Sequence, residues 1–178
     1  MSKLKTPVNS QDHIQGSPDA LITLVEYGDF QCPHCAAAHP VIHRIQKSFA
    51  KKLRFVFRHF PLSNSHEYAF AAAVASEAAA RQDKFWEMHD MLFEHQAEFS
   101  ENAFLVFAND LGLDMHNFRK DLTDKSLAQR VEMDFESGMR SGVNGTPSFY
   151  INELKYNGAY DFASLDQEIT EKIQKSLV

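Results

Sequence analysis

The chain of 178 residues contains only two cysteines, and they stand two residues apart in the segment FQCPHC at residues 30–35. The apolar, β-branched residues 21–25 before this segment are typical of a strand, and residues 36–49 after it are typical of a helix. The two sulfur atoms are therefore expected one helical turn apart, within bonding reach of each other. This placement of Cys32 and Cys35 predicts a redox-active dithiol.

The surroundings of Cys32 favour its thiolate, which is the nucleophilic form of cysteine. The unpaired N–H groups at the start of the predicted helix stabilise negative charge there. His34 can add a hydrogen-bond donor or a positive charge beside the sulfur, and Pro33 holds the turn rigid because it fixes φ at the first helical position. We therefore predict a lowered pKa for Cys32 as the attacking thiol, with Cys35 as the more buried resolving thiol.

Metal binding is an alternative interpretation of the cysteine pair. A structural zinc site needs two further ligands, and the chain has no second cysteine pair. Cys35, His39 and His43 do share one face of the predicted helix, but the outer two are about 12 Å apart, too far to surround one ion. We therefore predict no metal site and interpret His39 and His43 as packed or solvated side chains. A plain structural disulfide is a further, less favoured alternative.

Composition indicates one globular domain over residues 1–178. Hydrophobic residues make up 44% of the chain and include 15 phenylalanines, enough to build a sizeable core. The formal charge of −6 at pH 7 argues against nucleic acid or an anionic membrane as a partner. No run of residues is long and apolar enough to predict a stable membrane insertion.

The N-terminal segment bears on where the protein works. Residues 1–20 contain two lysines but no apolar segment and no small-residue cleavage site, so we expect no secretory signal. The sequence as written is therefore expected to be cytoplasmic, or periplasmic if it is a mature form. A chain whose only cysteines are catalytic suits both compartments.

The rest of the chain alternates between strand and helix patterns. Residues 1–19 are polar and turn-rich, and we expect an arm leading to the sheet. Residues 53–60 alternate with period two and predict a strand, whereas residues 63–142 have helical periodicity throughout. These segments are followed by a hairpin at residues 148–156 and by a final helix that Asp161 or Ser164 caps. This order predicts an α/β fold.

Two residues raise specific structural questions. Pro40 is expected to kink the helix after the dithiol or to end its first part. Glu26 lies in the apolar strand before the dithiol, where an unpartnered acid is costly. It either faces solvent at a sheet edge or, as we favour, is a buried carboxylate with a raised pKa that relays the proton of Cys35.

Three features together resemble the DsbA family of the thioredoxin superfamily. They are the strand that ends in VEYGDFQCPHC, the segment FRHFPL, and the late Gly-Thr-Pro strand start that follows a long helical insert. The resemblance extends from about Asp12 to the C-terminus. It implies a thioredoxin fold in which residues 63–142 form an inserted, all-helical cap over the active site.

The resemblance also implies roles for individual residues. Cys32 corresponds to the attacking thiol, Cys35 to the resolving thiol, and Glu26 to the family's buried acid. Pro147 corresponds to a cis proline whose loop faces the dithiol and lines the substrate groove. Thr146, just before it, would offer backbone hydrogen bonds to an extended substrate peptide.

The predicted function is thiol–disulfide exchange with protein or peptide substrates through the Cys-Pro-His-Cys dithiol. The reaction needs no cofactor, but a redox partner must recycle the dithiol. A quinone-linked membrane oxidase would serve outside the cytoplasm, and glutathione or a thioredoxin system within it. The alternatives are a cytoplasmic disulfide reductase, isomerase or redox sensor, and a noncatalytic thioredoxin-fold module that binds peptides.

Overall fold

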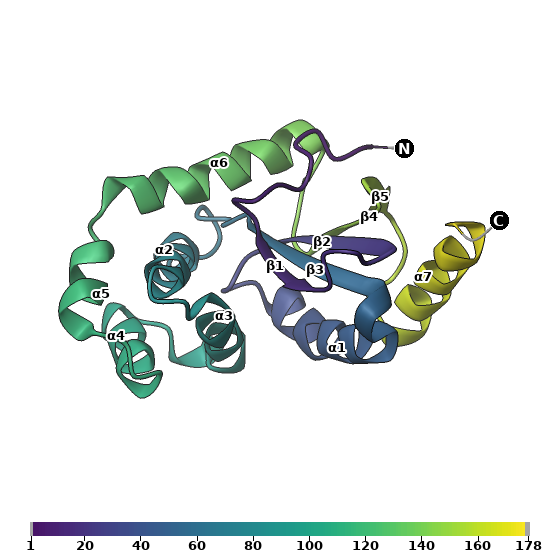
Figure 1. Cartoon of the computed structure of the whole chain (residues 1–178). Helices are drawn as coiled ribbons and strands as arrows, with labels where there is room; N and C mark the ends of the chain where they lie inside the picture. The colour runs from purple at the N-terminus through teal and green to yellow at the C-terminus, as the bar shows by residue number, and fades with distance from the viewer. Residues whose placement is uncertain (1, 177–178) are drawn as a thin grey trace.

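The computed structural model describes residues 2–176 and has a five-stranded sheet at its centre (Figure 1). The strand order is β1-β3-β2-β4-β5, in which β2 pairs parallel with β3 and antiparallel with β4. The strands are β1 (His13–Gly16), β2 (Ile22–Gly28), β3 (Leu53–His59), β4 (Ser148–Ile151) and β5 (Leu154–Tyr156). The strand that leads to the dithiol is thus the central one.

Seven α-helices and two short 3₁₀ helices surround the sheet in the described part of the chain. They are α1 (Pro33–Phe49), η1 (Ala50–Lys52), α2 (Ala69–Ala80), α3 (Phe85–Glu94), η2 (Gln96–Glu98), α4 (Glu101–Asp110), α5 (Met115–Asp121), α6 (Lys125–Ser141) and α7 (Phe162–Ser176). Within residues 2–176, no helix combines the length and apolar character needed to cross a membrane. The predicted α/β class is confirmed.

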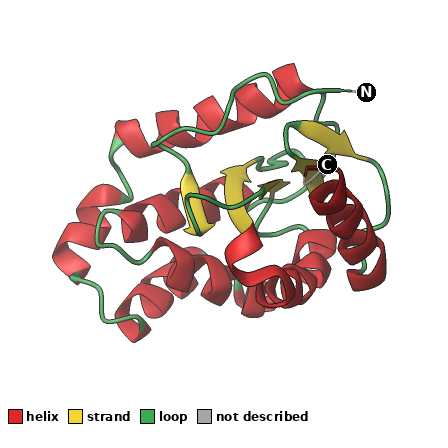
Figure 2. Ribbon diagram, turned by 45° about the vertical axis from the view of Figure 1, so that its right-hand side comes forward, coloured by secondary structure: helices red, strands yellow, loops and turns green. Residues whose placement is uncertain are grey.

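The helices form layers on both faces of the sheet. In Figure 1, α6 passes above the sheet, α1 lies below it, and α2 to α5 gather beyond one end. Figure 2 shows from another side that the strands lie between these helices. Successive side chains of β2 point to opposite faces of the sheet and enter two hydrophobic cores. Leu24 packs in the larger core with α1 and α7, whereas Val25 and Tyr27 pack in the smaller one with Phe135 of α6.

Two predictions about the first half of the chain need correction. The predicted N-terminal arm contains β1, which pairs antiparallel with β3 at the edge of the sheet. Its residues are only partly buried, so the strand lacks the apolar alternation that reveals strands in a sequence. The second correction concerns one of the two outcomes expected for Pro40: it does not end the helix, since α1 runs unbroken from residue 33 to residue 49, and a kink there stays a prediction. Buried contacts of Ala38 and Ile42 on either side help to hold the helix.

The helical boundaries in the middle of the chain follow their capping residues. The side chains of Ser100 and Asp114 accept hydrogen bonds from backbone N–H groups at the starts of α4 and α5. Gly112 has a φ of +72°, a left-handed conformation that ends the preceding helical segment. At the last helix, Asp161 rather than Ser164 is the cap, since the N–H of Ser164 donates to Asp161 Oδ1.

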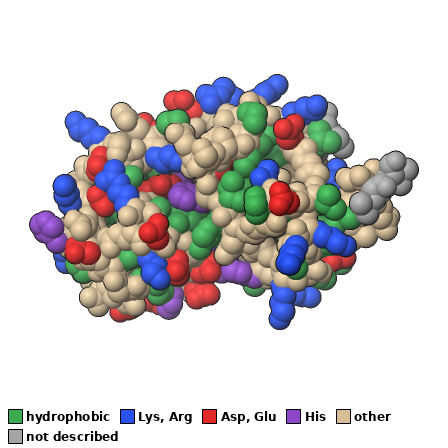
Figure 3. Space-filling view, in the orientation of Figure 1, with side chains coloured by type: hydrophobic (Ala, Val, Ile, Leu, Met, Phe, Trp, Pro, Cys, Tyr) green, Lys and Arg blue, Asp and Glu red, His purple; other side chains and the backbone are tan. Residues whose placement is uncertain are grey.

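The surface carries both signs of charge. On the face shown in Figure 3, acidic and basic side chains are interspersed. This agrees with a chain in which 18 basic and 24 acidic residues nearly balance.

Candidate active site

Cys32 and Cys35 lie where the central strand passes into α1. Cys32 is the N-cap residue of α1, Pro33 occupies its first turn, and both cysteines are buried free thiols. The N–H of Cys32 donates to the carbonyl oxygen of Asp29 (3.1 Å), which closes the turn after β2. The local pattern of strand, turn and proline-started helix therefore places the two sulfur atoms as the sequence predicts.

The two thiols differ in acidity. The pKa of Cys32 is lowered to about 5, chiefly because the Cys35 thiol donates a hydrogen bond to its sulfur, with help from the backbone N–H groups of Cys35 and His34. The pKa of Cys35 is raised well above its ordinary value, first by burial and then by its bond to Cys32. At neutral pH this arrangement favours a thiolate at Cys32 and a thiol at Cys35.

The His34 side chain contributes less directly than the sequence suggests. Its Nδ1 lies 2.9 Å from the hydroxyl of Tyr160, and the imidazole is exposed. Its backbone N–H, rather than its ring, favours the thiolate of Cys32. The ring is thus held by the segment before α7, which the helical pattern of the sequence does not reveal.

The loop before β4 lies against the dithiol. The peptide bond between Thr146 and Pro147 is cis, and the Thr146 carbonyl oxygen is 3.5 Å from Cys32 Sγ. Thr146 Oγ1 is buried, and the Thr146 side chain also helps to lower the pKa of Cys32. The structure therefore brings Thr146 and Pro147, which are more than a hundred residues from the cysteines in the chain, to the sulfur of Cys32.

Glu26 is buried in the middle of the sheet, between Phe57 of β3 and Phe149 of β4. Its exposed fraction is 2%, so the alternative of a solvent-facing edge position is wrong. Burial, and secondarily the charge of Cys32, raise the pKa of Glu26 to about 8. The charge of Glu26 in turn raises the pKa of Cys35, so the protonation states of the two groups are coupled.

A buried carboxylate that the sequence analysis missed fixes the loop around the dithiol. Asp29 accepts hydrogen bonds from the N–H of Gln31 (2.8 Å), the N–H of Leu62 (2.9 Å) and Nδ1 of His66 (2.7 Å). Its own N–H lies 3.5 Å from Cys35 Sγ. Its position directly after an apolar strand, in the turn that leads to the dithiol, is the sequence signal that could have identified it.

Gln96 of η2 was also missed. Its side-chain nitrogen donates to the carbonyl oxygens of Phe30 (2.8 Å) and Cys32 (3.0 Å). These contacts tie the helical segment between β3 and β4 to the dithiol turn. No local pattern around Gln96 indicates this contact, because its partners lie more than sixty residues away.

Solved structures share this architecture. BdbD from Bacillus subtilis is 23% identical with a TM-score of 0.85, and the match covers 97% of this chain and 98% of that one. Alpha-DsbA1 from Wolbachia pipientis is 22% identical with a TM-score of 0.85, over 98% and 96% of the two chains. These likenesses show that the chain has the same fold as BdbD and alpha-DsbA1.

Sequence relatives carry a different name. Na(+)/H(+) antiporter NhaA 1 from Salinispora arenicola is 41% identical over 168 residues, which are 94% of this chain and 26% of the relative. The protein of the same name from Mycolicibacterium vanbaalenii is 42% identical over 166 residues, 92% of this chain and 27% of the relative. The chain thus spans about a quarter of the length of these relatives.

The sequence profile described as Thioredoxin matches residues 8–171, which include all five strands, the dithiol and the Thr146–Pro147 loop. On this match and the geometry above, the chain belongs to the thioredoxin family.

Proposed function

We propose that the protein is a thiol–disulfide oxidoreductase that exchanges disulfides with protein or peptide substrates through Cys32 and Cys35. The observation that supports this most strongly is the opposed acidity of two buried thiols at the start of one helix. One sulfur is prepared to act as nucleophile or leaving group at neutral pH, and the other is held protonated behind it.

In the oxidising direction, a substrate thiolate attacks Cys32 Sγ of the Cys32–Cys35 disulfide. The sulfur–sulfur bond breaks, Cys35 leaves with the electron pair and gains a proton, and a mixed disulfide joins the substrate to Cys32. A second substrate thiolate then attacks the substrate sulfur and releases Cys32 as a thiolate. The substrate loses two electrons and the dithiol gains them.

In the reducing direction, the Cys32 thiolate attacks one sulfur of a substrate disulfide, whose sulfur–sulfur bond breaks and releases the other sulfur as a thiolate. The resulting mixed disulfide is resolved when deprotonated Cys35 attacks Cys32 Sγ, which forms the Cys32–Cys35 disulfide and releases the second substrate sulfur as a thiolate. Cys35 must lose its proton for that step. Glu26 is suited to accept it because its carboxyl has a pKa of about 8 and interacts electrostatically with Cys35. We assign Glu26 the role of proton acceptor in reduction and proton donor in oxidation.

The loop at Thr146 and Pro147 is our candidate for the substrate-binding edge. It lies beside Cys32 Sγ, so a peptide joined to that sulfur would run next to it. The Thr146 carbonyl can accept a hydrogen bond from a substrate N–H, as in strand addition.

The direction of exchange follows from the acidity of Cys32. A stabilised thiolate stabilises the reduced dithiol, which makes the disulfide a stronger oxidant. We therefore favour disulfide donation, with a redox partner that reoxidises the pair; no cofactor is needed. Sodium–proton exchange, the activity in the names of the sequence relatives, is not proposed for this chain, which matches only about a quarter of their length.

Trapping of the mixed disulfide tests the proposal. In Cys35→Ser the resolving thiol is absent, so incubation with a disulfide-bonded peptide should leave that peptide attached to Cys32. Cys32→Ser should trap none, and wild type should release the peptide. Equal labelling of Cys32→Ser and Cys35→Ser, or no labelling of either, would contradict the assigned roles.

A further inference from the structure

A cluster of two histidines and an aspartate lies between α1 and α3, apart from the dithiol chemistry. His39 and His43 project from successive turns of α1, and Asp90 projects from α3. His39 Nε2 is 3.0 Å from Asp90 Oδ1, His43 Nε2 is 3.3 Å from the same oxygen, and the two Nε2 atoms are 2.9 Å apart. The histidines alone do not form a site; α3 supplies the third group.

These three contacts cannot all be hydrogen bonds. Each histidine needs a proton on Nε2 to donate to Asp90, but two protonated Nε2 atoms at 2.9 Å then bring two N–H groups together. If only one Nε2 carries a proton, the other directs its lone pair at the carboxylate oxygen. Without a further group, one contact among His39, His43 and Asp90 is always unfavourable.

A divalent cation removes this conflict. Both imidazoles can then present lone pairs, and the carboxylate oxygen presents a negative charge, all to one ion. The three atoms form a triangle with sides of 2.9, 3.0 and 3.3 Å. An ion about 2.0–2.2 Å from each atom fits above such a triangle, the distances at which zinc binds imidazole and carboxylate.

The surroundings of Asp90 support a ligand role. Nδ1 of the neighbouring His89 is 2.9 Å from Asp90 Oδ1, and the His89 side chain is only 4% exposed. A buried N–H donor that orients a ligating carboxylate is typical of metal sites. On the other side, the side chains of His43 and Asp90 are 43% and 35% exposed, so an ion can enter and keep open positions.

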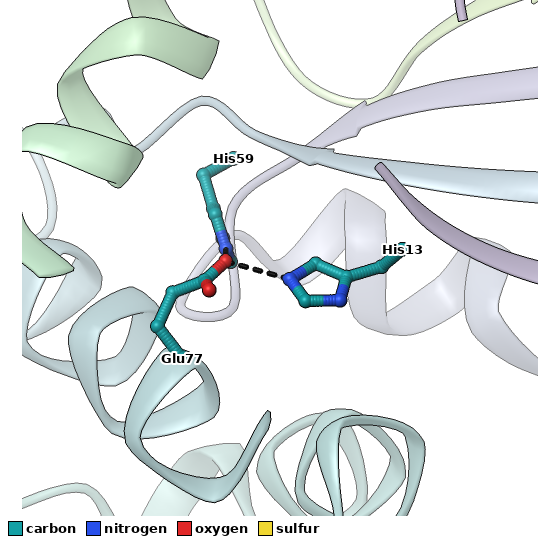
Figure 4. Close-up of side chains that lie close together, drawn as sticks. All are labelled: His13, His59 and Glu77. Carbon is teal, nitrogen blue, oxygen red and sulfur yellow. Dashed lines mark hydrogen bonds and ion pairs between the residues drawn. The ribbon is translucent and has the colours of Figure 1, made fainter. Parts of the chain in front are cut away.

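A second cluster of two histidines and one acidic residue provides a comparison (Figure 4). His13 and His59 approach Glu77 from different strands, and each Nε2 lies 2.7 Å from Glu77 Oε1. Here both histidines can donate to the same oxygen without conflict. The His13 ring stacks on the ring of Phe85, with 3.4 Å between the ring centroids. Hydrogen bonds account for the contacts of both Nε2 atoms with Glu77, which makes this group a matched control.

We propose that His39 Nε2, His43 Nε2 and Asp90 Oδ1 bind one divalent transition-metal ion of the Zn²⁺ class. Two imidazoles and a carboxylate suit zinc and its neighbours copper and nickel rather than calcium or magnesium. The ion would join α3 to the helix that begins at the dithiol. The site contains no thiol, so this proposal is tested independently of the proposed function.

Zinc binding to the Cys32→Ser/Cys35→Ser double variant tests the site without interference from the thiols. Equilibrium dialysis against zinc chloride should give one zinc ion per chain. Adding His39→Gln, His43→Gln or Asp90→Asn should each weaken binding at least tenfold, whereas adding His13→Gln or the exposed His116→Gln should leave the affinity unchanged. Circular dichroism verifies that each variant is folded.

Two results would overturn the proposal. One is a double variant that binds no zinc while wild type does, which would place the ion on the cysteines. The other is undiminished binding in folded His39→Gln and Asp90→Asn proteins, or a loss of binding in His13→Gln, which would place the ion elsewhere.

Discussion

The side-chain nitrogen of Gln96 lies 3.0 Å from the carbonyl oxygen of Cys32 and holds the dithiol turn from the side of the helical segment. The same nitrogen also donates to the carbonyl oxygen of Phe30, so one amide group spans the turn that carries Cys32. The shape of that turn therefore depends on where η2 is placed, and not only on the local sequence.

Replacing Gln96 by alanine removes both bonds. We expect Gln96→Ala to lower the free energy of unfolding by about 1–2 kcal/mol, since the carbonyl oxygens of Phe30 and Cys32 each lose one donor, although that of Cys32 keeps the N–H of Ala36. Urea unfolding measures the loss. Gln167→Ala is the matched control, because Gln167 donates only to Glu171 on the exposed side of α7. An equal, small effect of both substitutions would show that Gln96 does not support the turn.

The acidity of Cys32 can be read from the pH dependence of its alkylation. In the reduced protein, the rate of reaction with iodoacetamide should rise with a midpoint near pH 5, because the pKa of Cys32 is lowered to about 5. In Cys35→Ala the midpoint should move upward, since the main hydrogen bond to the thiolate comes from the Cys35 thiol and alanine has no donor. A midpoint near pH 9 in the wild type would rule out the stabilised thiolate.

Glu26 should make the reduced protein less stable as pH rises. Its carboxyl has a pKa of about 8 in the folded state against 4.5 ordinarily, so between these values the unfolded chain releases a proton that the folded chain retains. Stability from this group is complete below pH 4.5 and is lost as pH approaches 8.

Glu26→Gln, which cannot ionise, should remove that loss. We expect the advantage of the reduced variant over wild type in unfolding free energy to be about 4 kcal/mol larger at pH 8.5 than at pH 5. Denaturant unfolding at both pH values measures this, with the exposed Glu132→Gln as control. A difference that grows as pH falls would have the wrong sign for a buried, protonated acid.

Asp29 should be essential for the loop around the dithiol. Asp29→Asn keeps the shape of the side chain but replaces one acceptor oxygen by an N–H donor, which then faces the donors of Gln31 or of Leu62 and His66. We expect a loss of about 2–3 kcal/mol in unfolding free energy, measured by urea unfolding. Asp19→Asn, in an exposed turn, should cost less than about 0.5 kcal/mol.

The parts of the fold that the sequence predicted are those determined by local pattern. The strand at Leu53–His59 alternates clearly, and the capping residue Asp161 locates the start of the last helix at Phe162. The edge strand at His13–Gly16 was missed because partial burial on one side leaves little apolar signal. Its pairing with β3, rather than its composition, makes it a strand.

The residues of the candidate sites also fall into those that a local sequence pattern reveals and those that only tertiary packing brings in. Cys32 and Cys35 are evident from their spacing, whereas Gln96 and Asp90 act on residues 64 and 51 positions away in the chain, respectively. Such contacts arise from the packing of whole helices, which no short motif encodes. His39 and His43 could be placed on one face of a helix from the sequence, but not the aspartate that faces them.

The reduction potential of the Cys32–Cys35 pair tests the central claim most directly. It is measured by thiol trapping after equilibration in glutathione buffers of graded ratio. A thiolate with a pKa of about 5 predicts an oxidising pair, with a potential above about −200 mV and toward the −120 mV of DsbA. A potential at or below about −270 mV, as in thioredoxin, would contradict disulfide donation and make the protein a reductase.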